Sequence, residues 1–288
     1  MRRVCTALAL LFIAYPLFSQ KVNGRLHLEQ GKTIQLQVDL KNTVTQQGGG
    51  QAIDLVVSGT ALHSYTVTNN TGDNTTLHHD VQRIRFDFEG MGQKRSFDSQ
   101  NENDMNGPWG PSVAEMLGKR YDMIIDTLGR TLLVNPEGIK LQQSDDRFAI
   151  VSNMLRELIG IIYPPQKGTQ SFFKVLPDYA VTVGDKWSET VDTEHEKSDT
   201  EYTLTSITDT TLLIDFQTKA ITTNRSQLMG TPISSIMNST VMGKIIIDRK
   251  SGIIREKISN IESTGTTEAM GATTPISAVT IIAITTRH

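Results

Sequence analysis

The sequence predicts a mainly β protein of the α+β class, in which a long curved antiparallel sheet, or a half-barrel, packs around one central helix at about residues 146–162. Three observations lead to this prediction. Apolar and polar residues alternate along much of the chain, Gly- and Asn-rich turns separate the alternating segments, and one long segment shows helical spacing instead. Strict alternation is typical of antiparallel strands that have one packed face and one wet face.

The strands follow from this alternation and from the turns between them. Apolar residues occupy every second position from 34 to 40 and from 84 to 88, and Gly90-Met91-Gly92 indicates a hairpin. The final strand is apolar on both faces, so we expect it in a covered, central position. The expected strands lie near 33–45, 52–68, 82–89, 93–98, 120–126, 130–134, 187–192, 200–207, 211–220, 241–248, 253–262 and 277–286.

The segment from Asp146 to Ile162 has the spacing of an amphipathic helix. Its apolar positions, which include Leu155 and Leu158, fall on one wide face. Residues 144–146 are polar and suit the start of a helix, and Pro164 and Pro165 end it. A helix with such a face needs a sheet to cover it, so we expect the sheet to wrap around it. A second, shorter helix is expected at Ser112–Leu117.

The chain divides into four predicted parts. Residues 1–19 have the layout of a secretory signal peptide, with Arg2 and Arg3 before an apolar core that is too short for a comfortable membrane span. Residues 20–143 form an N-terminal antiparallel β part, residues 144–165 the amphipathic helix, and residues 166–288 a C-terminal β part. The two β parts could form one continuous domain or reflect a duplication.

The composition indicates where the protein is located and which classes of partner it binds. The chain carries 28 basic and 31 acidic residues, and its net charge is −3, so electrostatics gives it no reason to bind nucleic acid. No later apolar run reaches membrane length, and the one cysteine, Cys5, lies inside the predicted signal peptide. We therefore expect an exported protein, periplasmic or extracellular, that is soluble, not lipid-anchored, and without a transmembrane segment in its mature form.

A family resemblance rests on several short motifs. Pro177 is followed by Val181, Val183, Gly184-Asp185 and Trp187, and turns led by Asp126 and Asp248 close apolar strands. With Phe97-Asp98-Ser99 and the signal peptide, these motifs resemble an uncharacterised exported β-rich family of Bacteroidetes, a domain of unknown function. The resemblance implies an exported, sheet-dominated protein and brings no catalytic residues with it.

Few residues stand out as candidates for a site. The weak ligand-binding candidates are Trp109, Leu155, Leu158 and Trp187; for both tryptophans, packing into the core is the competing interpretation. No metal site is predicted, although His78 and Asp80 share a strand face and form the cluster with most metal-ligand character. No catalytic residue and no cofactor are expected.

The sequence is compatible with three hypotheses for function. The first is a non-catalytic exported module that binds a partner, such as an envelope protein, or an apolar ligand; at the level of architecture it resembles the periplasmic lipoprotein carriers. The second is an exported hydrolase of glycan or peptide that uses paired acids such as Asp122 and Asp126. The third is an envelope scaffold that self-associates through edge strands. The oligomeric state is left open.

Overall fold

The computed structural model describes residues 20–48, 51–90, 92–140, 146–228 and 231–287. The predicted signal peptide, residues 1–19, lies outside these ranges, and so do the expected capping residues Ser144 and Asp145. Export therefore stays a prediction.

Twelve strands in the described part of the chain form one antiparallel sheet, which does not close into a barrel. This confirms the predicted fold class. In chain order the strands are β1 (Thr33–Gly48), β2 (Gln51–Asn70), β3 (Asn74–Gly90), β4 (Gln93–Asp98), β5 (Arg120–Asp126), β6 (Thr131–Asn135), β7 (Lys186–Asp192), β8 (Glu196–Ile207), β9 (Thr211–Leu228), β10 (Thr231–Asp248), β11 (Ile254–Ala269) and β12 (Ala272–Arg287).

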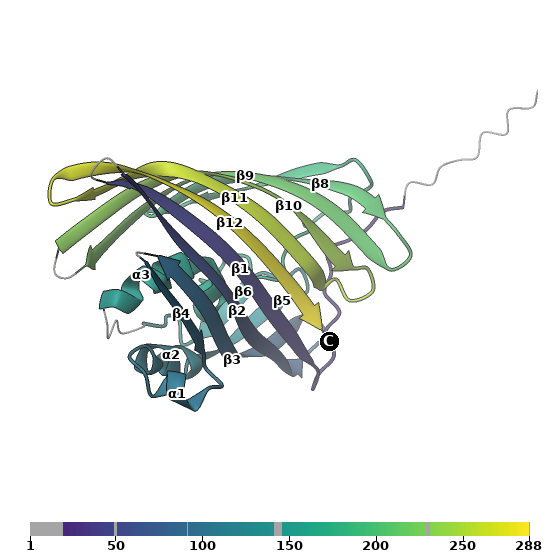
Figure 1. Ribbon diagram of the computed structural model, residues 1–288. Coiled ribbons are helices and arrows are strands. Elements are labelled where there is room, and N and C mark those ends of the chain that lie inside the picture. The colour runs from purple at the N-terminus through teal and green to yellow at the C-terminus, as the bar shows by residue number, and fades with distance from the viewer. Residues whose placement is uncertain (1–19, 49–50, 91, 141–145, 229–230, 288) are drawn as a thin grey trace, which may run out of the picture.

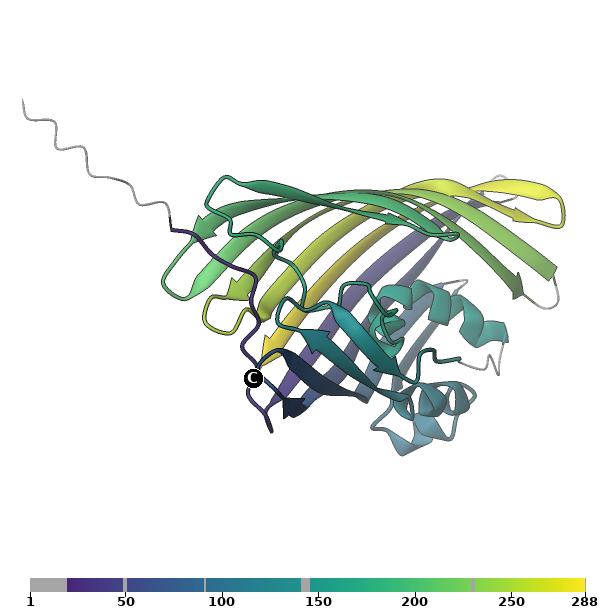
Figure 2. The same cartoon turned by 180° about the vertical axis from the view of Figure 1, so that it is seen from behind.

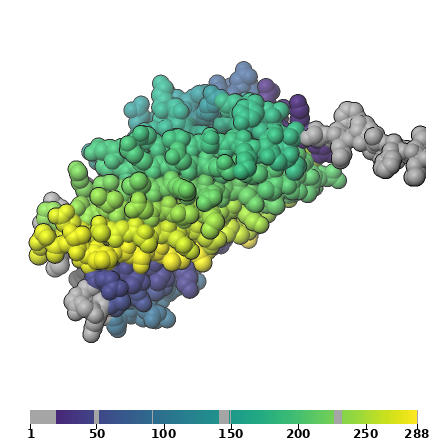
Figure 3. Space-filling model, turned by 90° about the horizontal axis from the view of Figure 1, so that it is seen from above, coloured from purple at the N-terminus to yellow at the C-terminus, as the bar shows by residue number. Residues whose placement is uncertain are grey.

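The order across the sheet is β6-β5-β3-β2-β1-β12-β11-β10-β9-β8-β7, with β4 paired to β3 outside this path. The first and last of the described strands, β1 and β12, are thus neighbours, with Leu40 opposite Ile282. Figure 1 shows the sheet curving along its whole width, and Figure 3 shows β12 lying beside β1 when the sheet is seen from above. The two predicted β parts share this one sheet.

The inner face of the first half is apolar because the sequence alternates there. Ile34, Leu36, Val38 and Leu40 on β1 are 0–4% exposed, while the intervening positions carry Gln, Asp and Lys. Removing such side chains from water is the main stabilising contribution to a sheet with one packed face. The helices cover this half of the concave side (Figures 1 and 2).

The predicted central helix is interrupted, which corrects the expectation of a single helix over residues 146–162. The segment comprises α3 (Asp146–Met154), α4 (Arg156–Ile159) and the 3₁₀ turn η1 (Gly160–Ile162). Asn42 on β1 donates a hydrogen bond from Nδ2 to the Met154 carbonyl at 3.0 Å, where α3 ends. The Leu158 amide then bonds the Leu155 carbonyl with tighter, three-residue spacing at 2.8 Å.

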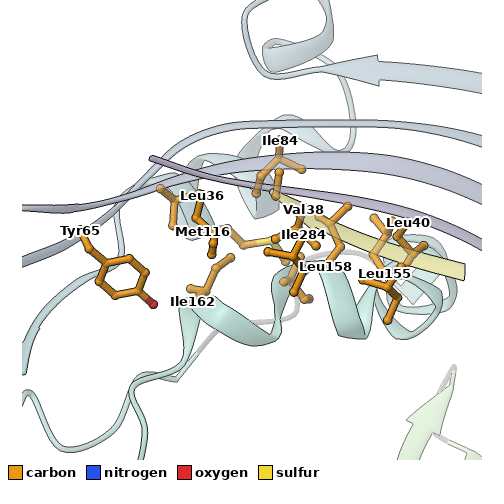
Figure 4. Close-up of a cluster of buried hydrophobic side chains, with 14 of the residues drawn as sticks. Leu36, Val38, Leu40, Tyr65, Ile84, Met116, Leu155, Leu158, Ile162 and Ile284 are labelled. Carbon is orange, nitrogen blue, oxygen red and sulfur yellow. The ribbon is translucent and has the colours of Figure 1, made fainter. Parts of the chain in front are cut away.

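This helical segment still buries the face that the sequence predicts. Leu155, Leu158 and Ile162 are 0–1% exposed. Figure 4 shows these three side chains directed at the inner residues of β1 and at Ile284 on β12. The segment lies to one side of the sheet, with α4 packed on β1 and β2, so the other half of the concave side is left to different contacts.

Two short helices complete this half of the molecule. They are α1 (Glu102–Met105) and α2 (Gly110–Leu117); the second matches the predicted helix at 112–117, and the first was not predicted. Trp109 precedes α2 and packs on Phe86, with ring centroids 5.3 Å apart. Among the described residues, no helix combines the length and the apolarity needed to cross a membrane.

A second, smaller core lies at the start of β9 and the end of β10. Leu212, Ile214, Ile245 and Ile247 pack there with Val181. Val181 belongs to an extended segment that pairs with Val22 near the start of the described chain. This core supports the C-terminal half of the sheet without help from the helices.

One prediction about the sheet was wrong in part. β12 is central, but it is not covered on both faces, because Val279 and Ile281 on its outer face are 54% and 46% exposed. Strands β9 to β12 also extend well beyond the predicted ends. Their inner positions near the hairpin tips mix polar residues such as Ser235 and Ser263 with apolar ones such as Met237, so the apolar alternation weakens although the pairing continues.

Candidate functional site

A groove of about 350 Å³ opens on the concave side between the helical segment and the inner faces of β1 and β9–β12. Its volume lies within the range of about 300–1,000 Å³ that is typical of small-molecule sites. Its lining is mixed. Apolar lining residues include Val44, Ile150, Met154, Met237, Ile261 and Ile276, and polar ones include Asn42, Thr222, Ser235, Ser239, Ser263 and Thr280.

Cross-strand register creates this lining. Ser239 on β10 stands opposite Ser263 on β11, and their hydroxyls bond at 2.7 Å. Thr280 on β12 donates to the Asn42 side chain at 3.2 Å, and Asn42 in turn holds the Met154 carbonyl. The floor of the groove is therefore tied to its helical wall by a chain of hydrogen bonds.

The wall of the groove carries charge at its α4 end, where Arg156 and Glu157 line it. Lys257 on the inner face of β11 lies close enough to Glu157 for their charges to interact. Burial lowers the pKa of Lys257, and the charges of Glu157 and Glu189 oppose that shift. Confinement by the surrounding protein raises the pKa of Glu157, although its side chain keeps access to solvent.

An aromatic row runs beside this charged end. Trp187 on β7, Tyr202 on β8 and Phe216 on β9 stand at paired positions on the inner face, and the Trp187 and Tyr202 rings stack with centroids 5.5 Å apart. Tyr202 donates its hydroxyl to Glu189 at 3.3 Å. The Lys257 ammonium lies 5.2 Å from the centroid of the Phe216 ring, a cation–π distance.

Gly243 makes room for this arrangement. It stands between Phe216 and β11, and a Cβ at Gly243 would lie only 2.5 Å from the Phe216 ring and 2.2 Å from the Ile258 carbonyl. Because Gly243 has no side chain, the Phe216 ring extends over β10 toward Lys257 on the next strand. A glycine within a strand commonly marks such a close approach.

The structure separates the ligand-binding candidates taken from the sequence. Trp109, Leu155 and Leu158 are 9%, 1% and 0% exposed and belong to the main core, so they can support the groove only from behind. Trp187 is partly exposed and donates its indole N–H to the Val175 carbonyl at 3.1 Å. It stands one strand away from Tyr202, within the aromatic row.

The weak metal-ligand candidates have other partners. His78 Nδ1 lies 2.7 Å from Asp122, and Asp80 accepts from the Arg120 guanidinium at 2.7 Å. Among the described residues, no group of three or more His, Cys, Asp or Glu side chains is placed to hold a metal ion. Both candidates lie on the strand face turned away from the helices, because the alternate residues of β3 are buried.

The paired acids of the hydrolase hypothesis are not arranged for glycoside hydrolysis. Asp122 and Asp126 share the outer face of β5, whose alternate residues are buried. Four residues of strand separate them by about 13 Å, beyond the spacing of about 5–9.5 Å that flanks a scissile glycosidic bond. Asp122 contacts His78, and Asp126 accepts from the Leu128 and Arg130 amides within its own turn, at 2.9 Å each.

A buried histidine pair was missed by the sequence reading. His63 Nδ1 and His79 Nε2 lie 3.1 Å apart, and both residues are 0% exposed. Burial lowers the pKa of His63 to about 4, and the nearby Leu158 backbone acts in the opposite direction. The Nε2 atom of His63 has no hydrogen-bond partner among the described residues. Burial, together with the nearby His63 and His78, lowers the pKa of His79 to about 3. The signal was available, since His63 and His79 each occupy an inward position in an alternating strand.

Comparison with known proteins gives one family match. A model described as a family of unknown function (DUF6263) matches residues 166–254, which contain β7 to β10. No curated protein matches the chain.

Solved structures give distant likenesses. The chain is similar to lipovitellin, in a structure of its lipid–protein interactions, with 10% identity and a TM-score of 0.44 over 89% of this chain and 25% of that one. The chain thus spans about a quarter of that relative's length. It is also similar to an outer membrane channel from Pseudomonas putida F1, with 7% identity and a TM-score of 0.25 over 91% of this chain and 98% of that one. A third likeness is to the β domain of the Bordetella autotransporter BrkA, with 9% identity and a TM-score of 0.22 over 88% and 99% of the two chains.

Proposed function

We propose that this protein is a non-catalytic binding protein whose concave groove holds an amphipathic ligand with an apolar chain. The observation that carries the proposal is the groove itself, with its mixed lining of apolar, hydroxyl and amide side chains. Apolar residues give a chain contact area, and hydroxyls offer hydrogen bonds to polar parts of the same ligand. Ser239 and Ser263 bond to each other, and the pair keeps one O–H donor and several lone pairs for a ligand.

The location in the cell is part of the proposal. The predicted signal peptide at residues 1–19 favours export, so we propose that the ligand is met outside the cytoplasm. Detection of the protein in the periplasmic or culture fraction, with its N-terminus at residue 20, supports this. Retention of residues 1–19 on a cytoplasmic protein contradicts it.

The groove can be tested by blocking it from within. Ser239 faces the groove, whereas Thr240 beside it on β10 is exposed on the outer face. We expect Ser239→Trp to weaken binding of a neutral dodecyl polyoxyethylene ether by about tenfold or more, since one bulky side chain displaces the ligand chain. Thr240→Trp is the matched control and should bind as the parent protein does.

Binding is measured by calorimetry with the ether below its micelle concentration, and thermal unfolding checks that both variants fold. Native mass spectrometry of the purified protein adds an independent readout, because a resident amphiphile gives an added mass. If the parent protein shows no saturable binding, or if Ser239→Trp binds as well as Thr240→Trp, the groove is not the binding site.

A further inference from the structure

One ammonium, that of Lys257, lies beside the α4 end of the groove and close to an aromatic ring. Lys257 is partly buried, its aliphatic stem comes from β11, and its Nζ lies 5.2 Å from the centroid of the Phe216 ring. The Phe216 ring occupies space that a Cβ at Gly243 would otherwise fill. None of the described side chains forms an ion pair with Lys257.

Two carboxylates approach the same space from other elements. Glu157 comes from α4 in the groove wall, and Glu189 comes from β7 across the aromatic row, where Tyr202 fixes it with a hydrogen bond at 3.3 Å. Their charges interact with Lys257 without contact. Arg156 beside Glu157 and Glu196 on β8 add one further charge of each sign to the surroundings of Glu157.

Neither a simple anion nor a simple cation matches this set. An anionic group at Lys257 also meets the field of Glu157 and Glu189, and a cationic group at the glutamates also meets Lys257. Burial lowers the pKa of Lys257 and raises that of Glu189, and the surrounding protein raises the pKa of Glu157 although its side chain is exposed, so each group is disfavoured in its charged form. A ligand that brings both signs of charge relieves all three groups together.

Resting on the proposed binding function, we infer that the ligand is a zwitterionic amphiphile whose anionic group lies at Lys257 and whose cationic group lies between Glu157 and Glu189. Its apolar chain extends along the groove past Met154, Ile261 and Met237. Tyr202 bonds Glu189 and stacks on Trp187, so aromatic rings stand near the place of the cationic group, and the face of such a ring favours an alkylated ammonium.

The test compares four probes that share one dodecyl chain. They are dodecylphosphocholine, dodecyl phosphate, dodecyltrimethylammonium and the neutral dodecyl polyoxyethylene ether, each titrated by calorimetry below its micelle concentration. We expect the full chain to bind dodecylphosphocholine at least tenfold more tightly than the ether, which corresponds to one or two charge-assisted contacts. The two singly charged probes should bind close to the ether.

Variants then change the preference in opposite directions. Lys257→Gln should remove most of the advantage of dodecylphosphocholine and shift the preference toward dodecyltrimethylammonium. The double variant Glu157→Gln/Glu189→Gln should shift it toward dodecyl phosphate. Binding of the neutral ether should stay within about twofold in both, since the apolar part of the groove is untouched. Lys244→Gln, which removes an exposed lysine on β10, is the control and should change none of the four affinities.

The outcomes separate the two proposals. If none of the four probes binds saturably, the proposed binding function fails. If the ether binds but dodecylphosphocholine binds no better, or if the charge variants leave the ratios between probes unchanged, the groove holds an amphiphile without a zwitterionic head and the inference is overturned.

Discussion

Acidification should destabilise this protein before most of its carboxylates titrate, because of the buried pair His63 and His79. Their pKa values in the folded protein are about 4 and about 3, well below the ordinary 6.5. A histidine whose pKa is depressed by burial stays neutral in the folded protein at pH values where the unfolded chain already binds a proton. For a histidine, stability is therefore complete above pH 6.5 and falls as the pH drops toward the folded pKa.

The magnitude follows from the two pKa shifts. While the unfolded chain takes up a proton and the folded chain does not, each histidine removes about 1.4 kcal/mol of unfolding free energy per pH unit. Between pH 6.5 and pH 5 the pair together removes about 3 kcal/mol, a large part of the ~5–15 kcal/mol typical of a folded protein. The loss continues to about pH 4 for His63 and about pH 3 for His79.

Urea denaturation at several pH values between 7.5 and 5, followed by circular dichroism, measures this effect. The double variant His63→Phe/His79→Phe keeps two aromatic rings in the core and should show a much flatter profile, whatever its absolute stability. His195→Gln removes an exposed histidine and should follow the parent profile. If the parent and the double variant lose stability equally over this range, the histidine pair does not stay neutral in the fold and the reasoning fails.

Two further predictions concern packing. Leu158 is 0% exposed under the sheet, so Leu158→Ala should lower the free energy of unfolding, measured by urea denaturation, by about 2–5 kcal/mol. Leu132 is more exposed, and Leu132→Ala should lower it by less than about 1 kcal/mol. Equal losses would mean that the helical segment is loosely packed. Gly243→Ala forces a Cβ into the Phe216 ring, so it should lower the free energy of unfolding by about 1–3 kcal/mol and change the near-ultraviolet circular dichroism. Gly160→Ala is the control and should be neutral, because a Cβ there meets nothing within 4 Å.

Most of the fold could be predicted because its main signals are local. The alternation from Ile34 to Leu40 marks a strand whose inner face is buried, and the burial observed there agrees with it. The wide apolar face that contains Leu155 and Leu158 likewise predicts a covered helix. Its interruption could not be predicted, since the Met154 carbonyl is held by Asn42, a residue distant in the chain.

The candidate site was harder to predict because it depends on register. Trp187, Tyr202 and Phe216 look like three separate core aromatics in the sequence, and only the pairing of β7, β8 and β9 places them in one row. Near the hairpin tips the groove is lined by a mixture of hydroxyl and apolar residues, so the period of two is weak in the sequence there. No local sequence pattern indicates that Lys257, on a strand, and Glu157, on a helix, lie close enough for their charges to interact.

The pairing of β1 with β12 has a consequence for assembly. Asn42 and Thr280, which bond across this seam, are separated by 238 positions in the chain. Contacts between such distant positions form late and slowly, and here they cannot form until the chain has been synthesised as far as Thr280. Until then β1 and β11 are unprotected edges, which invite pairing with other chains. The fraction of this protein that escapes aggregation would therefore depend on a chaperone that shields these edges, or on how soon β12 is synthesised and pairs.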